Sequence, residues 1–178
     1  MLANIIAKEA ENVFQEIFEK YPKNNFYGFA IYTDESATAI DIAANSLEYL
    51  SQTVSEVRNK RRQVIASFEC KWYSIEWELE GGFASSFKET KSTIDSLFIE
   101  NSESVAVSIV IQAMSDALNI LDKKNIFSKR VQREDVVLCI SAPDAERNEE
   151  IYEHSIHELN PTVVVQKFLS ERDKAYGI

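Results

Sequence analysis

The chain has 178 residues, of which 45% are hydrophobic and 27% are charged, an ordinary composition for one globular domain. Its formal net charge is −10, from 29 acidic and 19 basic residues, which argues against nucleic-acid binding because a polyanion needs a basic surface. Two cysteines do not make a disulfide scaffold, and no apolar run approaches the ~20 residues that span a bilayer. We therefore expect one globular domain over residues 1–178, located in the cytoplasm, with neither a nucleic acid nor a membrane as its partner.

An amphipathic helix is predicted over residues 2–21, where apolar side chains recur at helical spacing and Pro22 ends the element. A β-hairpin over residues 25–45 follows, and we expect the rest of the chain to be organised around it. Its first arm, residues 26–32, is apolar on both faces, which predicts a strand inside the sheet.

Strict alternation along that arm assigns its side chains to two faces. One face would carry Tyr27, Phe29 and Ile31, and the other Phe26, Gly28, Ala30 and Tyr32. A glycine in a strand permits close approach of a ligand, or more commonly of a packed helix or aromatic ring, and we favour the packing explanation for Gly28.

Residues 33–36 suit a short turn, and the second arm, residues 38–44, places Asp41 on a face that we expect to be wetter. A helix over residues 45–60 comes next, with Asn45 predicted as its N-cap.

The basic run RNKRR at residues 58–62 would close that helix, where positive charge suits the helix dipole. Residues 63–72 are interpreted as a strand, and residues 73–79 are ambiguous between a strand and a helical turn. The glycines at 81–82 mark a break in the chain.

Helices are predicted over residues 83–99 and 102–121, the second with a face broad enough to pack across a sheet. Residues 135–141 form a short apolar run typical of a buried strand, and residues 145–159 an acidic helix.

The chain would end with a last strand or helical turn over residues 162–169 and a frayed tail from Ser170. The order of these elements predicts an α+β fold: a mostly antiparallel sheet with helices packed on it.

The densest group of aromatic and acidic side chains consists of Trp72, Tyr73, Glu76, Trp77 and Glu78. Two tryptophans in six residues can form a partner-binding platform, or they can anchor the segment in the core, and we expect at least one of them in the core. Glu76 would suit a general acid if burial raised its pKa, although the sequence supplies no partner for it.

His154 and His157 lie three residues apart on a predicted helix, and Glu150 precedes His154 by four. These side chains are weak candidates for a metal site, but the spacing matches no standard zinc signature, so we favour a solvated helix face. Cys70 and Cys139 are interpreted as structural thiols. We expect neither a metal nor another cofactor.

The sequence has no phosphate-binding loop, dinucleotide-binding glycine motif or nucleophile elbow. The enzyme question stays open on this basis, with a non-catalytic role favoured.

Five strings resemble, in this order, a bacterial family known only as a domain of unknown function: FYGFAIYTDES, TAIDIAANS, KWYSIEWELEGG, LCISAPD and HELNP. This sequence departs from the family pattern in three places. Tyr73 separates Trp72 from Ser74, Ile75 stands where the pattern has proline, and residues 142–143 replace part of an acidic strand end. The resemblance implies no activity, but members are similar in size and acidity to bacterial immunity proteins, which neutralise toxins by binding them.

Three hypotheses about function follow. The first is a small cytoplasmic protein-binding domain, an immunity-type inhibitor of a basic toxin domain, steered by acidic charge and anchored by an exposed Trp77 or Tyr73. The second is an enzyme or metal-binding domain that uses Glu76 or the two histidines. The third is a structural domain that forms homo-oligomers through the sheet edge or the helix at 102–121.

Overall fold

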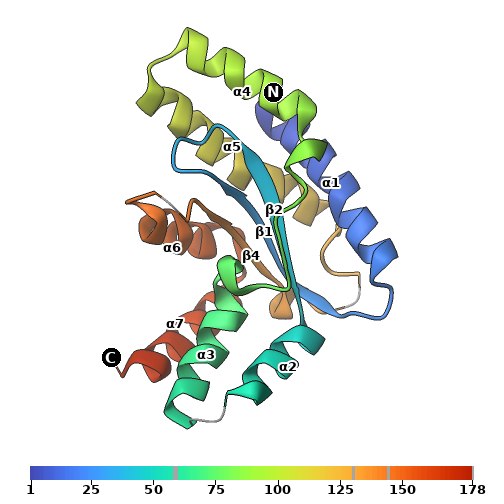
Figure 1. Ribbon diagram of the computed structural model, residues 1–178, viewed down its shortest axis with the longest axis vertical. Helices are drawn as coiled ribbons and strands as arrows, with labels where there is room; N and C mark the ends of the chain where they lie inside the picture. The colour runs from blue at the N-terminus through green and yellow to red at the C-terminus, as the bar shows by residue number, and fades with distance from the viewer. Residues whose placement is uncertain (58–59, 130, 144, 178) are drawn as a thin grey trace.

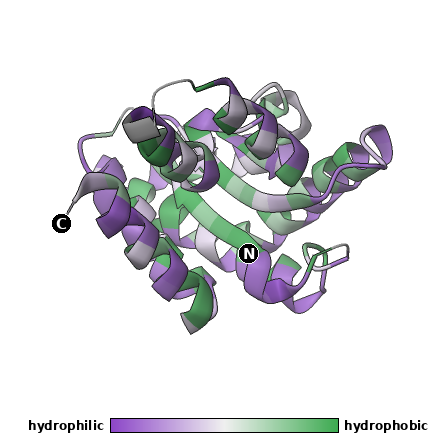
Figure 2. Cartoon of the chain, turned by 90° about the horizontal axis from the view of Figure 1, so that it is seen from below, coloured by the Kyte–Doolittle hydropathy of each residue, from purple (hydrophilic) through white to green (hydrophobic). Residues whose placement is uncertain are grey.

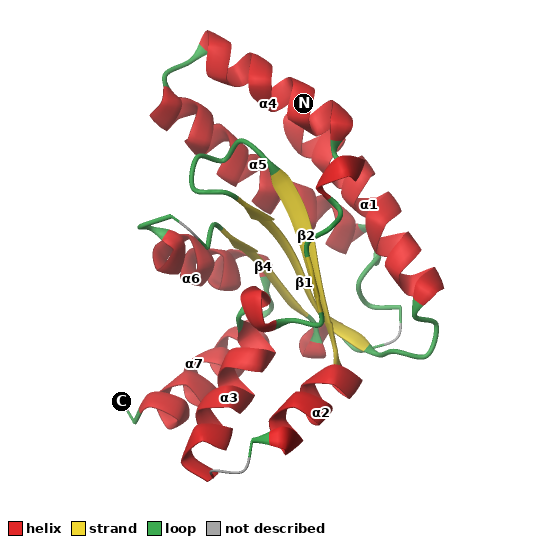
Figure 3. Ribbon diagram, viewed as in Figure 1, coloured by secondary structure: helices red, strands yellow, loops and turns green. Residues whose placement is uncertain are grey.

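A four-stranded mixed sheet lies between two groups of helices (Figures 1 and 3). The strand order is β3–β2–β1–β4, with antiparallel pairing of β1 with β2 and of β2 with β3, and parallel pairing of β1 with β4. The strands are β1 (Phe26–Thr33), β2 (Ile40–Ser46), β3 (Leu79–Glu80) and β4 (Val137–Ser141). The α+β class and the interior position of the first hairpin arm are confirmed, and β4 adds a parallel strand to an otherwise antiparallel sheet.

The computed structural model describes residues 1–57, 60–129, 131–143 and 145–177. Arg58 and Asn59 of the basic run, and Asp144 after the last strand, lie outside the described residues.

Helices cover both faces of the sheet, and Figure 2 shows long hydrophobic stretches along the strands between them. One group consists of α1 (Leu2–Lys20), α4 (Lys88–Glu100) and α5 (Glu103–Lys123). The other consists of α3 (Lys60–Trp72), α6 (Asn148–Leu159) and α7 (Thr162–Tyr176), with α2 (Leu47–Glu56) beside α3. Short 3₁₀ turns lie between these elements at Ser74–Glu76, Ala84–Ser86 and Arg133–Asp135.

Each face of the sheet has its own apolar core. On the α1 and α5 face, the rings of Phe14, Phe29 and Phe127 meet with centroids 4.7–5.4 Å apart. On the opposite face, Trp72 and Phe168 pack edge to face, with centroids 5.3 Å apart. The two cores together explain why β1 has no polar face.

By length and composition, α5 is the one helix in the described part of the chain that is long and apolar enough to cross a membrane. In the structure 44% of its apolar window is buried, and Val110, Met114 and Leu118 pack in the first core. This is the packing of a core helix in a globular domain.

The predicted helices at 2–21, 102–121 and 145–159 and the buried strand at 135–141 are confirmed, with shifts of a few residues at their ends. The helix predicted over 83–99 is α4, which begins only at Lys88.

The prediction of a strand over residues 63–72 is wrong, because this segment lies within α3. Three of its apolar residues, Val64, Phe68 and Trp72, recur every four residues, which is helical spacing, and Phe68 and Trp72 lie in the second core. The segment at 162–169 is likewise helical, as part of α7.

The predicted frayed tail is also wrong, because α7 continues to Tyr176. Its last turns are fixed from three sides: Glu171 accepts from Trp72 Nε1 (2.8 Å), Arg172 pairs with Glu153 (2.7 Å), and Tyr176 donates to Glu69 (3.2 Å).

A β-bulge changes the faces assigned to β1. The register shifts between Phe26, opposite Ser46, and Gly28, opposite Asn45. As a result Tyr27 lies in the second core with Ala30, and not on the face of Phe29 as strict alternation predicts. A bulge of this kind leaves no mark in the hydrophobic pattern.

Asn45 is not the N-cap of the following helix. Ser46 caps α2 by accepting from the Tyr49 amide (3.2 Å). Asn45 is fully buried, and its side chain donates to the Cys70 carbonyl (2.8 Å) and to the Tyr27 hydroxyl (3.0 Å). It thereby joins the end of β2 to the end of α3.

The outer edge of β4 is paired with side chains of α6 and its C-cap instead of with another strand. The Leu138 amide donates to Asn160 Oδ1 (2.9 Å), and the Ile140 amide to Ser155 Oγ (3.0 Å). Just beyond the strand, the Ala142 amide donates to Asn148 Oδ1 (2.8 Å). These bonds satisfy an otherwise open sheet edge and fix α6 against the carboxyl end of β4.

Candidate functional site

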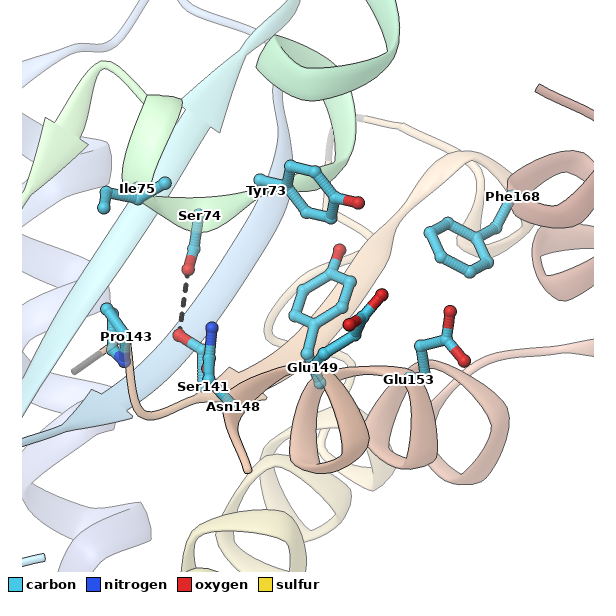
Figure 4. A pocket seen from close by; sticks show the side chains of 10 residues that line it. Tyr73, Ser74, Ile75, Ser141, Pro143, Asn148, Glu149, Glu153 and Phe168 are labelled. Atoms are coloured by element: carbon cyan, nitrogen blue, oxygen red, sulfur yellow. Dashed lines mark hydrogen bonds between the residues drawn. The ribbon is translucent and has the colours of Figure 1, made fainter. Parts of the chain in front are cut away.

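A pocket of about 250 Å³ opens at the carboxyl end of β4. It lies between the first turns of α6, the 3₁₀ turn Ser74–Glu76 and the side of α7 (Figure 4). The lining residues are Tyr73, Ser74, Ile75, Ser141, Pro143, Asn148, Glu149, Tyr152, Glu153 and Phe168. Ligands of open α/β sheets commonly bind outside the carboxyl ends of parallel strands, and β4 is the parallel strand here.

One end of the pocket is polar. The hydroxyls of Ser74 and Ser141 lie 3.0 Å apart, and the two residues are only 5% and 3% exposed. A bond between two hydroxyls uses one proton, so the second proton has no acceptor among the described residues. Asn148 accepts from the Ala142 amide through Oδ1, and its amide nitrogen has no bond with a described residue. This end therefore offers donors that are free to bind a ligand oxygen.

The wall of the pocket is aromatic. The rings of Tyr73 and Tyr152 meet at an interplanar angle of 73° with centroids 5.5 Å apart, and Phe168 lies 6.2 Å from Tyr152. The Tyr152 hydroxyl donates to the main-chain oxygen of Trp72, which fixes this ring between α6 and α3. The wall is thus rigid and largely apolar.

The other end of the pocket is acidic. Glu149 and Glu153 are one turn apart on α6, and Figure 4 shows both carboxylates on the side of Tyr73 and Phe168. Arg172 pairs with Glu153 (2.7 Å) and lies 5.7 Å from the Phe168 ring centroid, whereas Glu149 has no cationic partner among the described residues. Burial raises the pKa of the Tyr73 phenol, and nearby carboxylates, Glu149 among them, raise it further. The potential at this end is therefore negative.

The structure buries both tryptophans. Trp72 is 1% exposed and Trp77 is 4% exposed, so the expectation that at least one belongs to the core is confirmed, and the idea of Trp77 as an exposed anchor is wrong. The six-membered ring of Trp77 lies directly over Gly28, which confirms the packing explanation for that glycine.

Of the five predicted site residues at 72–78, Tyr73 alone lines the pocket, and Trp72, Glu76, Trp77 and Glu78 do not. Glu76 is exposed, so the burial that a general acid with a raised pKa requires is missing. Glu78 accepts from the Ser46 hydroxyl (2.6 Å) and so holds the N-cap of α2.

The histidine group lies on an exposed face of α6. His154 is 3.8 Å from Glu158, and Glu150 pairs with Arg147 at 2.8 Å. His157 is also exposed. Within the ranges that the structure describes, no three His, Cys, Asp or Glu side chains gather closely enough to hold a metal ion.

Cys70 and Cys139 are free and buried, in keeping with structural thiols. Burial raises the pKa of both, so the reactive thiolate is disfavoured.

Sequence reasoning missed the rest of the pocket. Ser141 and Asn148 come from the end of a strand and the start of a helix, and Phe168 comes from a segment with an ambiguous prediction. One available signal was the polar residue at the end of a buried strand, just before Pro143.

The positions where the sequence departs from the family pattern gather at the same place. Tyr73, Ile75 and Pro143 all line the pocket. The remaining segments of the resemblance have mainly structural roles, such as the bonds of Asn45 and of Asn160.

No curated protein and no solved structure matches the chain. The family model described as a domain of unknown function (DUF4303) matches residues 6–161, which confirms the resemblance and covers all four strands and most of the pocket. The chain therefore belongs to this family, the domain of unknown function DUF4303.

Proposed function

We propose that the protein is a small protein-binding domain, and that the pocket at the end of β4 receives one side chain of its partner. The observation that carries this proposal is the size and rim of the pocket. Its volume of about 250 Å³ is below the range of about 300–1,000 Å³ that is usual for drug-sized ligands, and it suits a single long side chain. Ile75, which is 54% exposed, adds an apolar contact at the rim.

The charge of the protein supports a basic partner. A net charge of −10 accelerates encounter with a basic surface and disfavours acidic ones. Inhibition of a basic toxin domain, as immunity proteins achieve by occupying it, is the role that we propose for this binding. Two free, buried cysteines fit the reducing cytoplasm as the place where it occurs.

Capture of a partner from native cell extract at low salt tests the proposal. The wild type is compared with Ile75→Ser, which removes the apolar contact at the pocket rim. The matched control is Ile99→Ser, since Ile99 is 85% exposed at the end of α4 and lies outside the pocket. Circular dichroism confirms that all three proteins are folded.

We expect one basic protein to be captured by the wild type and by Ile99→Ser, and to be lost with Ile75→Ser. The captured protein should then shift the amide signals of residues 73–75 in a nuclear magnetic resonance spectrum of the isotope-labelled wild type. Equal capture by both variants, or no capture at low salt, would contradict the proposal.

Self-association is a second candidate, favoured by an apolar groove along α5. Val105 and Ile109 are 46% and 37% exposed there, although they belong to the most apolar helix of the protein. Light scattering of the wild type and of Ile109→Glu tests it: a dimer that becomes a monomer in the variant supports self-association, and a monomeric wild type contradicts it.

A further inference from the structure

We infer that the side chain received by the pocket is that of a lysine, with its ammonium group beside Glu149 and its alkyl stem against the aromatic wall. This inference rests on the proposed function and names the chemistry that the same pocket recognises. Three features of the pocket carry it.

The first feature is an uncompensated charge. Arg172 neutralises Glu153 at the far side of the pocket, at a distance of 2.7 Å. Glu149 lines the same cavity and forms no ion pair with a described residue. The pocket thus carries one negative charge in excess, which one monovalent cation would balance.

The second feature is an aromatic wall that already holds a cation. The guanidinium of Arg172 lies 5.7 Å from the Phe168 centroid while it pairs with Glu153, so a carboxylate and a ring act together on one cation. Glu149 and the Tyr73 ring also line the pocket, and neither has a cationic partner among the described residues. A second guanidinium would crowd that of Arg172, whereas a compact ammonium needs only one carboxylate and a short stretch of wall.

The third feature is the donor end of the pocket. The unused hydroxyl proton of the Ser74–Ser141 pair belongs to side chains that are at least 95% buried, where a donor without an acceptor is costly. Asn148 lines the same pocket, and its amide nitrogen is also unengaged by described residues. A main-chain carbonyl of the lysine residue supplies the acceptor that these donors lack.

The test uses two small probes that differ only in the amine. N-acetyl-lysine methylamide carries the ammonium group, and N-acetyl-norleucine methylamide has a closely similar stem without it. Each is titrated into isotope-labelled protein and followed by amide chemical shifts. We expect the lysine probe to bind with a Kd in the millimolar range and to shift signals of residues 73–75 and 148–153, and the norleucine probe to bind at least about fivefold more weakly.

Glu149→Gln is the decisive variant, because it removes the charge and keeps the size of the side chain. This substitution should weaken binding of the lysine probe by about fivefold and leave binding of the norleucine probe unchanged. Glu100→Gln is the matched control, since it removes the same charge from an exposed position at the end of α4 and should leave both probes unchanged.

Equal binding of the two probes, no binding of the lysine probe, or lysine binding that Glu149→Gln does not weaken would each overturn the inference. Partner capture separates this failure from a failure of the proposed function. A partner lost with Ile75→Ser but retained by Glu149→Gln would leave the protein-binding site in place and exclude lysine as the recognised group.

Discussion

At the scale of single residues, the packing of the Trp77 indole against the sheet requires a glycine at position 28. A Cβ atom built on Gly28 would lie 2.9 Å from Cη2 and Cζ2 of Trp77, closer than packed carbon atoms tolerate. The indole is 4% exposed and lies between the sheet and the turn that carries the pocket, so it has little room to withdraw. The absence of one side chain thus sets the distance between the turn and the sheet.

We predict that Gly28→Ala lowers the free energy of unfolding by about 1–3 kcal/mol, as overpacking of a well-filled core does. Urea unfolding followed by tryptophan fluorescence and by circular dichroism measures the change. The same substitution in a Trp77→Phe background should cost clearly less, because the smaller ring leaves space for the methyl group. An equal cost in both backgrounds would show that the overlap is not the cause.

At the scale of secondary structure, α6 acts as a substitute for a neighbouring strand along β4. Ser155 accepts from the Ile140 amide, and Asn160 both accepts from the Leu138 amide and donates to its carbonyl (2.7 Å). The helix therefore closes the sheet edge with side chains, which keeps β4 from pairing with other chains. It also fixes the start of α6 beside the pocket.

We predict that Ser155→Ala destabilises the protein by about 1–3 kcal/mol, because the buried amide of Ile140 loses its acceptor. Hydrogen exchange of that amide should accelerate more than that of the amides paired with β1. Ser170→Ala, at an exposed position of α7, serves as the control and should change stability by less than about 0.5 kcal/mol. A neutral Ser155→Ala would mean that water replaces the hydroxyl.

The helices and strands also show how much of the fold the sequence predicts. The helical stripes of α1 and α5 are predicted by their periodicity and β4 by its continuous apolar, β-branched run, because both signals are local in the sequence. The i, i+4 spacing of Val64, Phe68 and Trp72 also indicates a helix. The prediction of a strand there assumed the wrong periodicity for the segment. The bulge at Tyr27 and the parallel pairing of β4 depend on contacts distant in sequence, so no local pattern contains them.

The candidate pocket was harder to predict for the same reason. Tyr73 was selected because aromatic and acidic residues cluster near it, yet both neighbouring tryptophans are core residues. Ser141, Glu149 and Phe168 come from three elements that meet only in the folded chain. A pocket whose lining residues are spread from Tyr73 to Phe168 has no compact motif.

At the scale of the whole molecule, several tyrosines make the free energy of unfolding depend on pH in the alkaline range. Burial is the first cause that raises the pKa of five of them, and it raises the pKa of Tyr32 to about 12. These tyrosines come from β1, α6, α7 and the segment after α3, and they lie in or against the second core and at the pocket: Tyr27, Tyr32, Tyr73, Tyr152 and Tyr176.

The direction of the effect follows from linkage. Above the unfolded tyrosine pKa of 10.0, the unfolded chain has released these protons while the native protein still holds them. Unfolding then releases protons, so rising pH favours it, and each such group lowers the free energy of unfolding by up to about 1.4 kcal/mol per pH unit. We predict that these groups do not change the free energy of unfolding below pH 10.0 and that they lower it steeply above pH 10.0. For Tyr32, this fall ends near pH 12.

Urea unfolding across this range, with tyrosinate absorbance recorded on the same samples, measures both quantities. Tyr27 and Tyr152, which are 2% and 4% exposed, should ionise together with the unfolding transition and not before it. Tyr152→Phe should lower stability at neutral pH, since the bond to the Trp72 carbonyl is lost, and should also make the alkaline fall less steep. Stability that stays constant well above pH 10.0, or a Tyr152→Phe variant with an unchanged slope, would mean that these phenols meet water in the native protein. The aromatic wall of the pocket would then be open to solvent and unable to strengthen a charge contact with a partner.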